Sequence, residues 1–203
     1  MILLEPGNFY HLYNRGNNKE NIFYEDRNYE HFLNLYRKYV SEMVETFAYC
    51  LMKNHFHFLV RVKQPAEPTC EVLKTSQVGK MVSRQFSHMF NAYAKAFNKA
   101  YNRTGSLFQE RFRRKIITSD RYFGQAILYI HVNPQRHRVI KDFRKYPYSS
   151  YRVMLSNDET FLAREKVVEY FGNRDMFHQF HENAFEEEVL REILEDEQDS
   201  LDL

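Results

Sequence analysis

The spacing of hydrophobic residues along the chain predicts an alternation of strands and helices. Apolar and polar positions alternate in the aromatic-rich segment 9–13, whereas apolar residues recur every three or four positions after Asp26. In chain order, these two periods predict a strand over 9–13, a helix from Asp26 through Tyr39, strands over 46–52 and 55–62, a long helix through 78–97, a basic strand over 106–117, and a helix that begins at Ser119 or Asp120 and ends at Pro134.

This order of elements is typical of a ferredoxin-like α+β fold, in which an antiparallel sheet is covered by helices on one face. Lys53 and Asn54 form a plausible two-residue turn between the two middle strands, since asparagine tolerates a positive φ. After Tyr151 the composition changes, and the segments 165–171 and 186–194 predict two short helices separated by an aromatic stretch. We therefore expect a domain over 1–152 and an acidic helical extension over 153–203.

The composition is that of a folded globular protein. The chain has 203 residues, of which 43% are hydrophobic and 16% aromatic, enough for a sizeable core. Its apolar stretches fall far short of the ~20 residues that span a membrane, and residues 1–6 lack the features of a signal peptide. The two cysteines, Cys50 and Cys70, provide neither a disulfide framework nor a four-cysteine metal site. These features predict a cytoplasmic protein that does not bind a membrane.

Charge is distributed unevenly along the chain. Residues 1–156 carry 25 Lys and Arg against 12 Asp and Glu, whereas residues 157–203 carry 4 against 15. A body this basic attracts a polyanion, and nucleic acid is the leading candidate. The acidic end has two interpretations, a solvated helical face or an internal polyanion that restrains DNA binding.

Two histidines interrupt the apolar strand predicted over 55–62. His55 and His57 are two residues apart, so both rings project from one face of the strand, while Phe56 and Phe58 project from the other into a core. Two neutral imidazoles can supply two of the ligands of a divalent-metal site, although half-buried histidines with structural roles are also common. A catalytic metal needs a third ligand, which must come from elsewhere in the chain.

The helix before Pro134 supplies polar candidates. Tyr122, Gln125, Tyr129 and Asn133 follow one another at steps of three or four residues, which places them on one stripe of the helix. A tyrosine hydroxyl and an amide could thus meet the two histidines at one surface of the sheet. Asn133 is the weakest member, because a residue that precedes proline is pushed away from helical geometry.

These residues belong to four segments that occur in a familiar order. The segments are 10–17 (YHLYNRGN), 52–60 (MKNHFHFLV), 105–109 (GSLFQ) and 129–134 (YIHVNP). Together they resemble the single-tyrosine HUH transposases, in particular the REP-associated tyrosine transposase branch. The resemblance covers roughly residues 8–152, and the acidic C-terminal segment departs from the minimal pattern of that family.

The resemblance implies a metal-dependent DNA transposase that cleaves and rejoins single-stranded, hairpin-bearing DNA. Tyr129 matches the family's nucleophile, which forms a 5′-phosphotyrosine link, and Tyr122 is the alternative on the same helix face. His55, His57 and Asn133 match the ligands of a divalent cation, Mg²⁺ or Mn²⁺. The family contains both dimers and monomers, so a homodimer is one expectation.

Two other functions stay open: a domesticated hairpin-DNA-binding protein without transposition, and a metal phosphodiesterase that uses water as its nucleophile.

Two further histidines are expected to have supporting roles. His131 is expected to be structural or to contact a DNA phosphate, and His11 to support the site as a neighbour.

A cluster of basic residues, interleaved with Phe108 and Phe112, predicts a groove for the DNA backbone. Most of them lie in the predicted strand over 106–117 and the turn that precedes it. The predicted DNA-binding residues are Arg15, Arg84, Arg103, Arg111, Arg113, Arg114 and Lys115.

Overall fold

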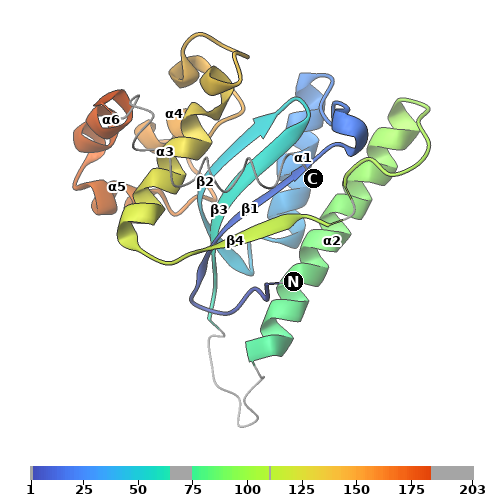
Figure 1. Cartoon of the computed structure of the whole chain (residues 1–203), viewed down its shortest axis with the longest axis horizontal. Helices are drawn as coiled ribbons and strands as arrows, with labels where there is room; N and C mark the ends of the chain where they lie inside the picture. The colour runs from blue at the N-terminus through green and yellow to red at the C-terminus, as the bar shows by residue number, and fades with distance from the viewer. Residues whose placement is uncertain (1, 65–74, 110, 184–203) are drawn as a thin grey trace.

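Four antiparallel strands form the centre of the molecule, as seen in a computed structural model that describes residues 2–64, 75–109 and 111–183 (Figure 1). The strand order in the sheet is β2-β3-β1-β4. The strands are β1 (Phe9–Arg15), β2 (Val44–Met52), β3 (His55–Val62) and β4 (Arg113–Ile117). The helices are α1 (Asp26–Tyr39), α2 (Thr75–Ala100), α3 (Asp120–Arg136), α4 (Tyr151–Leu155), α5 (Arg164–Phe171) and α6 (Arg174–Asn183), with short 3-10 turns η1 (Asn17–Lys19) and η2 (Phe143–Lys145). This arrangement confirms the predicted ferredoxin-like α+β fold.

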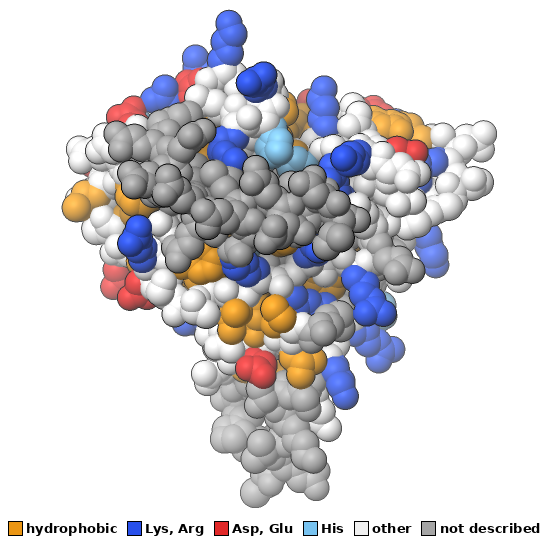
Figure 2. Space-filling model, viewed as in Figure 1, with side chains coloured by type: hydrophobic (Ala, Val, Ile, Leu, Met, Phe, Trp, Pro, Cys, Tyr) orange, Lys and Arg blue, Asp and Glu red, His pale blue; other side chains and the backbone are white. Residues whose placement is uncertain are grey.

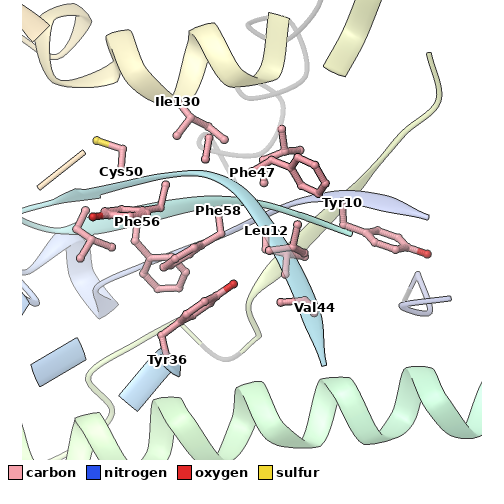
Figure 3. Packing of buried hydrophobic residues seen from close by; sticks show 14 of the residues in the cluster. Tyr10, Leu12, Tyr36, Val44, Phe47, Cys50, Phe56, Phe58 and Ile130 are labelled. Carbon is pink, nitrogen blue, oxygen red and sulfur yellow. The ribbon is translucent and has the colours of Figure 1, made fainter. Parts of the chain in front are cut away.

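The alternating strand residues sort into two faces, as the sequence pattern predicts. Leu12, Phe56 and Phe58 lie on the face toward α1 and α2, where the Phe58 ring stacks on Tyr36 with ring centroids 4.4 Å apart. The Tyr36 hydroxyl also shares a 2.7 Å hydrogen bond with Thr46 Oγ1 of β2. Figure 3 shows this layer on one side of the sheet and Ile130 of α3 on the other.

Helices cover both faces of the sheet, so the prediction of cover on one face is wrong. Helix α3 packs across β2 and β3, with Phe123 in contact with Phe9 and Phe47. Every residue of α3 from 122 to 134 is buried. A helix buried on all sides needs a partner on its outer side as well, and the C-terminal helices provide it: the Phe177 ring of α6 lies 5.9 Å from that of His131.

Several element boundaries differ from the predictions. The basic strand begins at Arg113 rather than at 106, because Leu107, Phe108 and Phe112 turn inward to the core. Helix α3 continues past Pro134 to Arg136, although Pro134 has no N–H to donate to the carbonyl of Ile130. The Lys53–Asn54 turn is confirmed, but Asn54 does not have the positive φ expected of it.

The C-terminal segment is folded against the sheet domain as far as the structure describes it. The helix expected over 165–171 is present as α5, and α6 occupies the aromatic stretch that follows. Ala163 N donates a 2.8 Å hydrogen bond to Thr46 O, which ties the start of α5 to β2. The helix expected over 186–194 lies outside the described residues, and the division of the chain at residue 152 stays a prediction.

Within the described ranges, no helix is both long and apolar enough to cross a membrane.

Candidate functional site

The pairing of β1 with β3 brings two histidines together beneath α3. In this register Tyr13 lies opposite His57, and His11 lies two residues earlier on the same face of β1. His11 Nε2 and His57 Nδ1 are 2.9 Å apart, and their rings stack at a centroid distance of 5.1 Å. The two side chains are only 2% and 3% exposed. His11 was predicted to lie beside the site, and it does so through a direct hydrogen bond to His57.

His55 completes a row of imidazoles on this face. Its ring meets the edge of the His57 ring at a centroid distance of 5.1 Å and lies equally far from the His137 ring. Its Nδ1 is 2.7 Å from Asn54 Oδ1. The same-face prediction for His55 and His57 is confirmed by this contact.

The environment keeps these imidazoles neutral. Burial, with a smaller contribution from Lys115, lowers the pKa of His11 to about 3. Although the His55 ring keeps some exposed surface, burial and then the nearby His137 lower its pKa to about 3. Burial likewise places the pKa of His57 well below its ordinary value. At neutral pH each ring therefore has a lone pair on one nitrogen, as a metal ligand requires.

Tyr129 of α3 lies directly over the histidine pair. Its ring meets the rings of His57 and His11 nearly edge-on, at centroid distances of 5.6 and 5.9 Å. The Arg136 guanidinium is 5.2 Å from the centre of the Tyr129 ring. The Tyr129 side chain has no exposed surface. A single chain thus brings the predicted tyrosine to the predicted histidines.

The alternative tyrosine, Tyr122, lies about two turns earlier on α3. Lys115 of β4 extends over it, with Nζ 4.9 Å from the ring centre. The ring contacts with the histidines belong to Tyr129, so the geometry favours Tyr129 as the candidate nucleophile.

Asn133 is one turn beyond Tyr129 and fully buried within the helix, despite preceding a proline. Its amide faces His55 and opposes the lowering of that histidine's pKa. Beyond its interaction with His55, neither Nδ2 nor Oδ1 of Asn133 has a hydrogen-bond partner among the described residues. A buried amide with so few hydrogen bonds is costly, and a cation or water at Oδ1 would relieve that cost.

No cluster of three or more His, Cys, Asp or Glu side chains is arranged to hold a metal ion in the parts of the chain that the structure describes. The predicted ligand set therefore depends on the Asn133 amide in addition to His55 and His57. The buried Asn133 amide beside His55 is the feature that fits this set.

The predicted DNA-binding residues are divided between the two faces of the sheet. Arg114 of β4 points toward α2, where its Nη1 donates a 3.0 Å hydrogen bond to Ser83 Oγ, while Lys115 points toward α3. This division follows from the alternation of side chains along a strand. Arg15 and Arg113 share the Lys115 face through their pairing with His55 and Tyr13. Arg103 forms an ion pair with Glu20.

A groove of about 1050 Å³ lies between α2 and the segment before β4. Arg84, Arg111 and Arg114 line it, so three of the seven predicted DNA-binding residues belong to one surface. Other lining residues include the cationic Lys80 and Lys95, the polar Asn91 and the aromatic Phe90 and Phe112. Figure 2 shows Lys and Arg side chains spread over the face on which β4 and α2 lie.

No protein-family model matches the chain, and no curated protein matches it in sequence. Among solved structures it is similar to a REP-associated tyrosine transposase bound to a REP hairpin. The TM-score is 0.51 with 14% sequence identity, over 77% of this chain and 84% of the transposase chain. The two proteins share a fold. At this level of identity the similarity is confined to the arrangement of strands and helices.

Two residues near the candidate site were not predicted from the sequence. Arg136 and His137 follow Pro134, where the helix was expected to have ended. Because α3 continues for two more residues, it brings Arg136 over Tyr129 and His137 beside His55. A longer predicted helix would have placed Tyr129, Asn133 and Arg136 on neighbouring turns, which is the only signal that the sequence offered.

Proposed function

We propose that this protein is a DNA strand transferase that cleaves and rejoins single-stranded, hairpin-bearing DNA through a covalent link to Tyr129. The observation that carries the proposal is the contact of the Tyr129 ring with His57 and His11. The fold shared with a transposase bound to a REP hairpin supports the same class of substrate.

In the proposed reaction, Tyr129 Oη attacks the phosphorus of a DNA phosphodiester. A bond forms between Oη and phosphorus while the bond to the 3′ oxygen breaks, and the hydroxyl proton of the tyrosine leaves to water. The products are a 5′-phosphotyrosine and a strand that ends in a 3′-hydroxyl after taking up a proton. Attack by another 3′-hydroxyl reverses these steps and rejoins DNA without ATP.

His55, His57 and Asn133 would hold a divalent cation, Mg²⁺ or Mn²⁺, which would act as a Lewis acid on the phosphate. Arg136, beside the Tyr129 ring, would stabilise the negative charge of the phosphate as it approaches. The groove between α2 and the segment before β4 would hold the DNA backbone through Arg84, Arg111 and Lys95.

A second candidate function is hairpin-DNA binding without strand transfer. It is favoured by the complete burial of Tyr129 and Asn133, since a DNA phosphate must reach the tyrosine hydroxyl for cleavage to occur. Under this second function the protein binds hairpins and forms no covalent adduct.

One assay separates these functions. The full chain is incubated with Mn²⁺ and a library of labelled hairpin oligonucleotides with randomised flanks, and protein–DNA adducts that resist denaturation are recovered. We expect an adduct with the wild-type protein and with Tyr122→Phe, and none with Tyr129→Phe.

The other outcomes identify the alternatives. Hairpin binding without any adduct supports the second function. DNA cleavage that survives Tyr129→Phe without an adduct indicates water as the nucleophile. An adduct that disappears only in Tyr122→Phe assigns the reaction to Tyr122.

A further inference from the structure

The hydrogen bond between His11 and His57 joins two buried imidazoles. A neutral imidazole has one N–H and one nitrogen lone pair, so one ring must donate and the other must accept. The atoms involved are His11 Nε2 and His57 Nδ1, at 2.9 Å. Their tautomers are therefore coupled: if His57 has its hydrogen on Nδ1, then His11 accepts at Nε2 and has its own hydrogen on Nδ1.

Packing alone does not account for a histidine at position 11. Leu59, which pairs with His11 across β1 and β3, is a buried apolar side chain on the same face, and an apolar side chain at position 11 would fill this layer without the cost of burying an imidazole. The ring instead contacts both the metal-ligand candidate His57 and the Tyr129 ring. A residue that touches both partners can set how they face each other.

We propose that His11 is a positioning residue, which holds His57 in the tautomer whose Nε2 lone pair is presented to a divalent cation. Hydrogen bonds to the second nitrogen of a ligating histidine fix its tautomer and its ring orientation in this way. This inference rests on the proposed function, because it assigns His11 a task only if His57 is a ligand.

The tautomer is measured directly by ¹⁵N NMR of the imidazole nitrogens in the full-length protein near pH 7, with no metal added. We expect His57 of the wild type to have its hydrogen on Nδ1. In His11→Phe we expect a mixture of the two tautomers. A His57 ring with its hydrogen on Nε2 in the wild type overturns the inference, whatever the protein does with DNA.

Metal affinity gives the second readout, by titration of Mn²⁺ alone into the same proteins. We expect His11→Phe to weaken Mn²⁺ binding about 10- to 100-fold, the range found for partners of ligating histidines. His11→Gln places an amide oxygen near the position of Nε2 and is expected to restore most of the affinity. His88→Gln, on the exposed face of α2, is the matched control and is expected to bind like the wild type.

The outcomes distinguish the two proposals. If the wild type binds Mn²⁺, His57→Ala does not, and His11→Phe binds as tightly as the wild type, the inference fails while the proposed metal site stands. If the wild type and His57→Ala bind Mn²⁺ equally or not at all, the proposed metal site fails and the inference fails with it. Should His11→Phe not fold, the inference is still tested by the tautomer of His57 in the wild type and by the Mn²⁺ affinity of His11→Gln.

Discussion

At the scale of single residues, a buried histidine takes its role from the group that faces it. His57 meets His11 and the Tyr129 ring on the sheet side of α3. His131, only two residues after Tyr129, points the other way and bonds to His181 Nε2 at 2.9 Å and to Ser150 Oγ at 2.7 Å. Both rings are buried, but His131 lies within a structural network, as the sequence suggested in one of its two interpretations.

Asn133 provides the residue-scale prediction, because the proposed function assigns its amide to a metal site rather than to the fold. We expect Asn133→Leu to change the free energy of unfolding by no more than about 1 kcal/mol, since among the described residues this buried amide has a hydrogen-bond partner in His55 alone. The same substitution is expected to abolish Mn²⁺ binding. Urea unfolding and Mn²⁺ titration of one protein preparation measure both effects. A loss of about 2 kcal/mol or more would show that the amide supports the fold through His55.

At the scale of secondary structure elements, the alternation of side chains in β4 divides the basic cluster between two surfaces. Arg114 belongs to the α2 groove, while Arg113 and Lys115 belong to the face of Tyr13 and Tyr122. A short strand of five residues thus contributes positive charge to both faces of the sheet. The two surfaces can be tested separately by substitution.

The element-scale prediction concerns the α2 groove. Arg84→Ala combined with Lys95→Ala removes two exposed charges from α2 and is expected to weaken binding to hairpin DNA. The slope of log affinity against log salt should fall by about 2, because each lost phosphate contact lowers it by about 1. Fluorescence anisotropy over a salt series measures both quantities. Arg152→Ala on α4, an exposed arginine that does not line the groove, is the control, and an equal effect there would contradict a specific groove.

At the scale of the whole molecule, the C-terminal helices are part of the structure that holds α3. His181 of α6 bonds to His131 of α3, and its own Nδ1 bonds to Phe177 O at 2.8 Å. Tyr151 stacks on Phe177 beside this pair. The helix that presents Tyr129 is therefore packed between the sheet and the C-terminal helices. Restraint of DNA binding by the acidic end remains a prediction, since residues 184–203 lie outside the described residues.

The buried histidines predict how stability depends on pH. Burial lowers the pKa of His181 to about 4 and that of His131 well below its ordinary value. Between pH 6.5 and 4 the unfolded chain therefore binds more protons than the folded one, so the free energy of unfolding falls as the pH falls through this window. Each such histidine contributes about 1.4 kcal/mol per pH unit.

Urea unfolding at a series of pH values checks this prediction. The wild type is expected to be most stable above pH 6.5 and to lose stability steadily toward pH 4. His181→Leu removes one of the groups that bind protons on unfolding, so its stability is expected to depend less steeply on pH. Parallel curves for the two proteins would rule out His181 as a source of the dependence.

The sequence by itself determined the local features of this protein. The two-residue period placed His55 and His57 on one face of β3 and Phe56 and Phe58 on the other, and the helical period placed Tyr129 and Asn133 on one stripe of α3. These predictions depend only on backbone geometry within one element. The order of the elements then predicted the antiparallel α+β fold.

Only the tertiary structure decided which of these features meet. The contact of Tyr129 with His57, the bond between His11 and His57, and the meeting of His55 with His137 all join segments far apart in the chain. Their distances depend on strand register and on how α3 packs between the sheet and α6, and hydrophobic periodicity carries no information on either. The same reason explains why cover on both faces of the sheet was missed: the face that α3 covers is set by contacts of Phe123 with Phe9 and Phe47, which lie far from it in the chain.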